Sequence, residues 1–267
     1  MTLTRSGPRK LLENLKRGLH LMTSVPSWAN VDERRNMPPT LAVSTVILGI
    51  REGVEGGPDK LCLPLVRRIR QPHAGLWALP GGPVGARESL GQAAGRTLAE
   101  TTGLRPNYLE QLYTFGDIDR SPTHRLVTIA YFALMHVDQV GATVRDENVA
   151  WFDIDDPQIA RMAFDHRQIV DYALWRLRNK TEYGQIAHRL LGERFTLAAL
   201  RGVYEAILGR RLDPANFRRT LNSTASIEAT DEYQAGGKHR PPRLYRYVGH
   251  GPDPLQVDPL QVEPPQG

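Results

Sequence analysis

A glycine pair followed by a helical pattern is the feature of this sequence that most restricts its fold. The run Leu79-Pro80-Gly81-Gly82 precedes a segment, residues 88–102, in which apolar side chains recur at helical spacing up to Gly103. A glycine directly after such a pattern is typical of a helix C-terminus, because it adopts the left-handed conformation without strain. The segment therefore predicts a strand, a tight loop and a helix in that order.

Extended segments lie on both sides of this unit. They are rich in Val, Ile, Leu, Thr and aromatic residues and are bounded by Gly, Pro or Asp, which is typical of strands. Together with the helix they predict an α+β domain. The predicted strands cover residues 41–50, 61–69, 108–115, 126–135 and 149–154.

Composition narrows the class of protein. The 267 residues are 40% hydrophobic and 24% charged, which is typical of a globular chain. The longest apolar run, Thr40 to Ile50, is far short of the roughly 18 to 20 residues of a membrane span, so we expect no membrane segment and a cytoplasmic protein. The single cysteine, Cys62, predicts a buried thiol rather than a disulfide or a zinc site.

Charge is distributed unevenly along the chain. Residues 41–160 carry a net charge of −3, whereas residues 161–249, with 16 basic and 9 acidic side chains, carry +7. Such a pattern is expected when one part binds a small molecule and another meets a polyanion, with nucleic acid as the leading candidate. The alternative is that the basic residues are solvated surface.

We expect four regions along the chain. Residues 1–38 form a partly disordered arm with a short amphipathic helix, and residues 39–158 form the α+β domain. Residues 159–248 form a basic helical module that ends in a hairpin. Residues 249–267 repeat Asp-Pro-Leu-Gln-Val and predict a disordered, Pro-rich tail.

The segment from Gly82 to Leu104 resembles the Nudix box. That box sets glycine, glutamate and arginine at fixed spacing across a loop and a helix, and this sequence keeps the spacing. The resemblance implies that residues 39–158 fold as a Nudix αβα sandwich. The matching residues are Gly82, Glu88, Arg96, Leu98, Glu100, Gly103 and Leu104.

Two departures fall where Nudix hydrolases bind metal. Their helix carboxylates, spaced i, i+3 and i+4, hold Mg²⁺ ions that activate water and neutralise a diphosphate. This sequence has Thr97, Glu100 and Thr101 at these positions. Because Mg²⁺ prefers anionic oxygen ligands, we expect no catalytic residues, no required cofactor and weak Mg²⁺ binding, with Glu100 as the residual candidate ligand. Residual pyrophosphatase activity is left open.

The segment that follows the box is similar to that of Nudix proteins that handle ADP-ribose-like fragments. Arginine can pair with phosphate through two hydrogen bonds, and aromatic rings can stack on adenine. For each candidate, core packing or surface solvation is the alternative role. The candidate effector contacts are Arg70, Trp77, Gly81, Gly82, Phe115, Arg120 and Arg125.

Residues from Arg194 to Leu221 have the organisation of a helix-turn-helix. One helix is predicted to start at Thr196 and to end at Gly209. Asp213 as N-cap and Pro214 in the first turn predict the start of a second helix. On the second helix Phe217 and Leu221 share the inward face, whereas Arg219 lies almost opposite and Arg218 on the flank. The following hairpin predicts a wing. The candidate DNA contacts are Asn216, Arg218, Arg219 and Asn222 on the helix, and Lys238, His239, Arg240 and Arg243 on the wing.

Five short runs in the second half of the chain closely resemble the Nudix-related transcriptional regulators called NrtR. The resemblance covers about residues 40 to 248 and implies a repressor of NAD biosynthesis and salvage genes. It also implies a degenerate Nudix domain that senses ADP-ribose or a related NAD metabolite, and a homodimer on a palindromic operator. The runs are Ala163–His166, Glu193–Leu197, Val203–Arg210, Asn216–Arg219 and Arg243–Arg246.

Two other functions remain as alternatives. The first is a Nudix pyrophosphatase of the ADP-ribose type with an accessory basic domain, which Thr97 and Thr101 argue against. The second is a non-enzymatic metabolite sensor whose C-terminal module binds another protein. For the fold of that module, the alternative to a winged helix is an ordinary helical dimerisation module.

Overall fold

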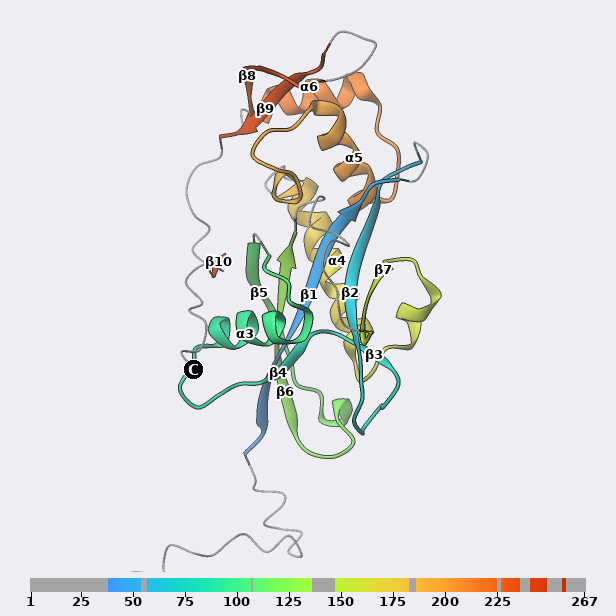
Figure 1. The fold of residues 1–267 in the computed structure, drawn as a ribbon, viewed down its shortest axis with the longest axis vertical. Helices are drawn as coiled ribbons and strands as arrows, with labels where there is room; N and C mark the ends of the chain where they lie inside the picture. Colours follow the sequence, from blue (N-terminus) through green and yellow to red (C-terminus); the bar gives the residue numbers. More distant parts are fainter. Residues whose placement is uncertain are drawn as a thin grey trace, which may run out of the picture. The chain divides into compact units, whose positions relative to one another are not determined.

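The computed structural model describes residues 38–53, 57–106, 108–135, 147–182, 186–224, 227–235, 241–248 and 256–257. The chain divides into two compact units, Met1–Pro39 and Thr40–Gly267, and the described helices and strands belong to the second (Figure 1). The predicted helix of the N-terminal arm lies outside the described residues. Within the described ranges, no helix is long and apolar enough to span a membrane.

A mixed sheet forms the centre of the second unit. Strand β1 pairs in parallel with β6 and antiparallel with β2 and β4, whereas β5 pairs with β6, and β3 and β7 both pair with β2. The strands are β1 (Thr40–Arg51), β2 (Lys60–Arg67), β3 (Trp77–Ala78), β4 (Gly81–Pro83), β5 (Tyr108–Phe115), β6 (Leu126–Leu134) and β7 (Val149–Asp153). All five predicted strands are present.

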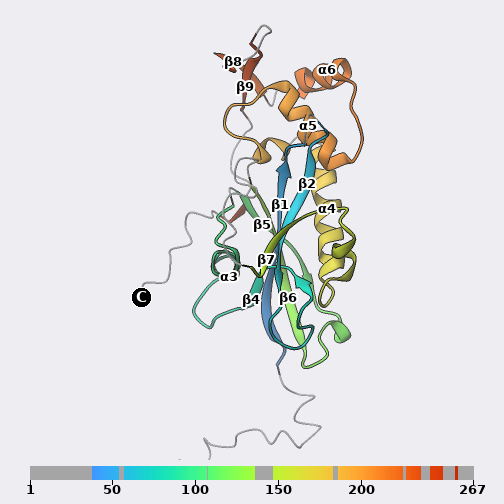
Figure 2. The ribbon, with the colours of Figure 1, turned by 45° about the vertical axis from the view of Figure 1, so that its right-hand side comes forward.

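Alternating side chains of the sheet pack against different helices. Val43 and Ile47 of β1 belong to the cluster formed with α3 (Leu90–Thr102), whereas Val46 and Leu48 belong to the cluster formed with α4 (His166–Glu182). Figure 2 shows the sheet between these two helices. The period-2 pattern therefore produces a helix–sheet–helix sandwich, as predicted.

Helix α3 begins and ends where the sequence indicates. Ser89 caps its N-terminus, because its hydroxyl accepts a hydrogen bond from Gln92 N–H and the Gln92 side chain accepts one from Ser89 N–H. Gly103 ends the helix with φ of 69°. At its C-terminal end the left-handed conformation of Gly103 turns the chain toward β5.

Helix α4 packs on the sheet, whereas we placed it in the C-terminal module. Its buried face, which includes Ile169 and Leu177, shares one cluster with β1, β2, β5 and β6. Lys180 pairs with the buried carboxylate of Glu110 in β5, and Arg176 donates to Leu112 O at 3.3 Å. The same cluster continues into the C-terminal helices, so no break in packing lies at residue 158, and the boundaries of the regions stay predictions.

The C-terminal module contains two helices and a two-stranded sheet. Phe195 adds a bridge to this sheet, with Tyr245 N–H donating to Phe195 O at 2.8 Å and Phe195 N–H to Tyr245 O at 3.1 Å. In the described part of the chain, three 3-10 segments lie in connecting loops: η2 (Ile118–Arg120), η4 (Pro157–Arg161) and η5 (Ala187–Leu190). The elements of the module are α5 (Leu197–Leu208), α6 (Pro214–Thr224), β8 (Ile227–Tyr233) and β9 (Arg243–Tyr247).

Part of the predicted disordered tail pairs with the sheet. Gln256–Val257 forms β10, which is antiparallel to Leu109 and Glu110 of β5. The unpaired backbone groups of an edge strand accept such an added strand, and this is a correction at these two residues. The other tail residues, 249–255 and 258–267, lie outside the described residues.

Candidate functional site

Lack of space for a side chain explains why glycine stands at both positions 81 and 82, between β3 and α3. A Cβ atom at Gly81 would lie 2.2 Å from Val43 O, and one at Gly82 would lie 3.0 Å from Thr97 Cγ2. Only residues without a side chain let β4 approach β1 and α3 so closely. The loop therefore keeps the path that the box spacing predicts.

A single guanidinium group occupies the space between the two glutamates of the box. Arg96 donates from Nε and Nη2 to Glu88 at 2.9 and 2.6 Å, and from Nη1 to Glu100 at 3.0 Å. Glu88 also accepts the Gly85 N–H, and the hydrogen bonds from Arg96 hold the pKa of Glu88 below its usual value. Both carboxylates therefore already form ion pairs with Arg96 within the protein.

Thr97 and Thr101 supply neutral hydroxyls where carboxylates would stand, and Mg²⁺ prefers anionic oxygen ligands. Their hydroxyls donate to the carbonyls of Ala93 and Thr97 at 2.8 and 2.6 Å, and Thr97 is buried against Gly82. Across the described part of the chain, no group of three or more His, Cys, Asp or Glu side chains is arranged to hold a metal. The residues present at the box do not fit the Mg²⁺ ions that Nudix chemistry implies.

The structure places Arg120 in a buried ion pair. Its Nε and Nη2 donate to the Asp165 carboxylate at 2.9 and 2.7 Å, and the side chains of Arg120 and Asp165 are 2% and 14% exposed. The sequence made Arg120 a candidate effector contact, with core packing or surface solvation as the alternative. The pairing depends on residues 45 positions apart, which no local pattern indicates, and a role of Arg120 in effector binding stays a prediction.

The remaining candidate effector contacts differ in exposure. Trp77 is half-buried, packs edge-on against Phe152 at 4.9 Å and donates from Nε1 to Gln158 at 3.2 Å. Phe115 is buried in the core beside Tyr172, so its ring meets α4. The exposed members are Arg70 and Arg125, and Arg125 donates to Asp117 O at 3.0 Å.

A short segment before α4 joins several of these elements. Ala163 N–H donates to Trp77 O at 2.8 Å, and Leu79 N–H donates to His166 Nδ1 at 2.9 Å. His166 therefore carries its proton on Nε2, and burial lowers its pKa to about 3. In the sequence this segment stood out only through the family resemblance. Its contacts with β3 and with the η2 loop were not predicted.

The helix-turn-helix has the predicted caps and faces. Asp213 accepts Asn216 N–H at 2.9 Å, and Gly209 ends α5 with φ of 67°. Phe217 packs edge-on against Tyr204 at 5.1 Å, and Leu221 is buried. The exposed residues of α6 include Asn216, Arg218 and Arg219, with Arg219 donating to the Asn216 side chain.

Glu205 of α5 organises the turn before α6. Its carboxylate accepts Leu212 N–H at 2.8 Å and lies 3.5 and 3.6 Å from Arg201 and Arg211. This acceptor fixes the residue directly before the N-cap of α6. Sequence periodicity placed Glu205 on the helix but gave no sign of its partners.

The described part of the wing comprises its two strands, β8 and β9. Arg243 is exposed on β9 and donates to Thr230 O at 2.6 Å and to Asp231 at 3.3 Å. Lys238, His239 and Arg240 lie outside the described residues, as does the side chain of Asn222. Their contacts with DNA stay predictions.

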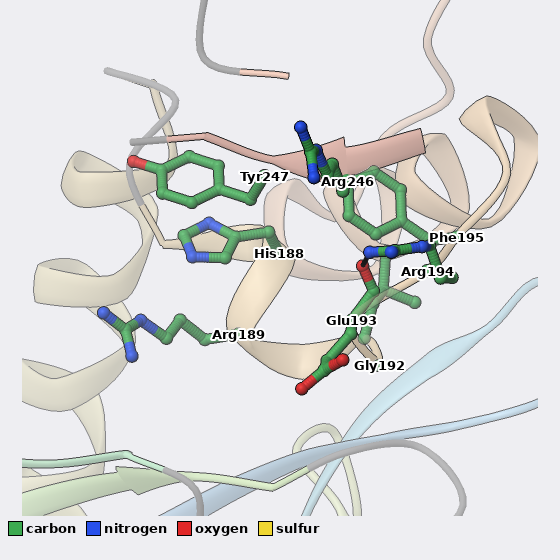
Figure 3. A pocket seen from close by; sticks show the side chains of 9 residues that line it. His188, Arg189, Gly192, Glu193, Arg194, Phe195, Arg246 and Tyr247 are labelled. Carbon is green, nitrogen blue, oxygen red and sulfur yellow. Dashed lines mark hydrogen bonds between the residues drawn. The ribbon is translucent and has the colours of Figure 1, made fainter. Parts of the chain in front are cut away.

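A hollow lies beside the base of the wing (Figure 3). His188 stacks flat on Tyr247 at 3.5 Å, and burial lowers the pKa of His188 to about 4. The arginines that line the hollow have partners: Arg194 lies 3.5 Å from Glu232, Arg246 lies 3.0 Å from Glu228, and Arg189 lies over the ring of Tyr108. The hollow is not a strongly cationic site.

Comparison with known proteins identifies both parts of the chain. Residues 19–173 match the NUDIX domain, and residues 187–247 match the NrtR DNA-binding winged helix domain. The chain is 34% identical over 213 residues to the "ADPR responsive transcriptional repressor NtrR" of Acinetobacter baylyi, covering 79% of this chain and 82% of the relative.

Solved structures of a regulator from Shewanella oneidensis have the same architecture. The crystal structure of its NrtR is 32% identical with a TM-score of 0.65, covering 78% of this chain and 94% of that one. Its complex with a 27mer DNA is 31% identical with a TM-score of 0.62, covering 78% and 93%. The predicted fold class, a Nudix domain followed by a winged helix domain, is confirmed.

Proposed function

Because this chain belongs to the NrtR family of Nudix-related transcriptional regulators, we propose that it is a repressor that binds DNA through α6 and the wing. It responds to ADP-ribose or a related NAD metabolite bound in the Nudix domain. The genes it controls are those of NAD biosynthesis and salvage, as the family resemblance implies.

The arrangement of α6 carries the proposal. Phe217 and Leu221 anchor one face of the helix in the core, while Asn216, Arg218 and Arg219 project from its exposed face. Arginine pairs with guanine and asparagine with adenine in the major groove, and arginine also meets phosphates. The related regulator from Shewanella oneidensis has been crystallised with a 27mer DNA, which supports the same role here.

Symmetry is the next part of the proposal. One α6 helix reads only a few base pairs, so specific binding at physiological salt favours two helices on two half-sites. We therefore propose a homodimer on a palindromic operator.

We propose that the Nudix domain binds its effector without efficient hydrolysis. The two glutamates of the box are paired with Arg96, and both threonine hydroxyls donate to backbone carbonyls. A hydrolase of the ADP-ribose pyrophosphatase type is the alternative. Steady-state turnover of ADP-ribose with Mg²⁺ separates them, because a rate constant in the ordinary enzymatic range of about 1 to 10³ per second would favour the hydrolase.

Selection of duplexes from a random-sequence DNA pool tests the regulatory function. The purified protein is expected to enrich a symmetric sequence whose half-sites lie about one helical turn apart. Equal retention of all duplexes would instead show that the module does not read sequence. The α6 substitution Arg219→Ala then tests whether that helix is the reader.

A further inference from the structure

The start of α4 connects two segments of the Nudix domain. Ala163 bonds to the backbone of β3 at Trp77, and His166 accepts the N–H of Leu79, two residues before the glycine loop. Asp165 binds Arg120 in the loop between β5 and β6. Both segments, residues 77–82 and the loop with Arg120, carry candidate effector contacts, so the start of α4 lies where these candidates meet.

The loop of residues 116–125 depends on Asp165 for its anchorage. Arg120 and Ser121 are its buried residues, whereas Asp117, Ile118, Asp119 and residues 122–125 are exposed. Its other described hydrogen bonds lie at its two ends or within it, such as Thr40 N–H to Arg125 O at 2.9 Å and Arg125 to Asp117 O at 3.0 Å. The middle of the loop is therefore held to the domain by the Arg120–Asp165 pair.

The same helix reaches the DNA-binding module. Arg178, near the other end of α4, donates from Nε to Ile207 O of α5 at 3.0 Å. One continuous helix, His166–Glu182, joins the residue that follows Asp165 to Arg178, which contacts α5. The loop at Arg120 and the helix before α6 thus share α4 as a common support.

We propose that Asp165 is a positioning residue for effector binding. It holds Arg120, and through Arg120 the loop that presents Arg125, in the conformation that binds the diphosphate of an ADP-ribose-like ligand. Asp165 itself does not touch the ligand. The inference rests on the proposed function and adds to it the residue that sets effector affinity from outside the pocket.

The test compares Asp165→Asn with Asp171→Asn in the full-length protein. Asparagine keeps the shape of Asp165 and removes the charge that holds the guanidinium. Asp171 lies on the same helix and pairs with Arg167 at 2.9 Å, but that pair is solvent-exposed. Calorimetric titration with ADP-ribose measures effector affinity, and anisotropy with a selected duplex measures DNA affinity.

We expect Asp165→Asn to weaken ADP-ribose binding by about ten- to 100-fold, the range for loss of a charge-assisted contact. DNA affinity without ADP-ribose is expected to stay within about twofold of the wild type, and Asp171→Asn is expected to change neither value. A purely structural role would lower both affinities together. The wild-type titration alone reports on the proposed function.

Either of two results would overturn the proposal. Unchanged ADP-ribose affinity in folded Asp165→Asn protein would show that the loop needs no anchor. Tighter binding would show that Asp165 competes with the ligand for Arg120. If Asp165→Asn does not fold, Asp165→Glu takes its place, because it keeps the charge and Arg120 but shifts the carboxylate by one methylene group. Weaker ADP-ribose binding with unchanged DNA affinity is expected for it, and unchanged ADP-ribose affinity would overturn the proposal.

Discussion

Replacement of Arg219 by alanine should remove sequence-specific DNA binding while leaving the fold intact. The side chain is exposed on α6, opposite the face that Phe217 and Leu221 bury. Its described contact within the protein is the hydrogen bond to Asn216 on the same helix. Because exposed substitutions away from caps and the core change stability by about 0.5 kcal/mol or less, the loss must arise in the complex.

The size of the effect follows from the contact that is lost. An arginine that pairs with a base edge contributes about 1 to 3 kcal/mol of discrimination, which corresponds to roughly five- to 150-fold in affinity. Two copies of α6 on the two half-sites of a palindrome double the free energy to about 2 to 6 kcal/mol. Binding to scrambled DNA should weaken far less, because phosphate contacts do not depend on sequence.

Fluorescence anisotropy across a salt series provides the measurement, with a selected duplex and a scrambled duplex of equal length. Arg105→Ala is the matched control, since Arg105 is an exposed arginine of the Nudix domain. Circular dichroism and sedimentation verify fold and assembly. If folded Arg219→Ala protein keeps full affinity and full discrimination, α6 is not the reading helix and the module is better described as a protein-binding surface.

Three further predictions concern the supports of the two sites. Arg120→Ala should lower the free energy of unfolding by about 3 to 5 kcal/mol, because it leaves Asp165 buried without a partner, and urea denaturation would contradict this if it matched Arg125→Ala. Glu205→Ala should weaken specific DNA binding more than Glu205→Gln, because glutamine still accepts Leu212 N–H; equal anisotropy curves for the two variants would reject the role of that bond. His166 has a folded-state pKa lowered to about 3, so the unfolded chain binds its proton first, and stability should fall as the pH drops from about 6.5 toward 3, by at most about 1.4 kcal/mol per pH unit from this group. His166→Asn, which retains an acceptor for Leu79 N–H, should reduce that slope in urea denaturation at several pH values.

Local signals made most of the elements predictable. Gly103 and Gly209 marked helix ends, Asp213 with Pro214 marked the start of α6, and runs rich in Val, Ile, Leu and Thr marked β1 and β6, all as the structure has them. Each signal lies within a few residues of the feature it predicts. The inward face of α6 was predictable for the same reason.

Contacts between distant residues were not predictable in this way. No local pattern indicated that Arg120 pairs with Asp165 or that α4 packs on the sheet. Both outcomes depend on which segments the fold brings together. The strand at Gln256–Val257 has the same cause, since its pairing depends on the free edge of β5.

Coupling between the two ligands tests the central claim most directly. A labelled duplex obtained by selection is titrated with the protein at several ADP-ribose concentrations, and ADP-ribose is titrated calorimetrically with and without saturating duplex. The account predicts that ADP-ribose changes DNA affinity by about five- to 150-fold, and that DNA changes ADP-ribose affinity by the same factor. Independent binding, with neither affinity altered by the other ligand, would contradict the account.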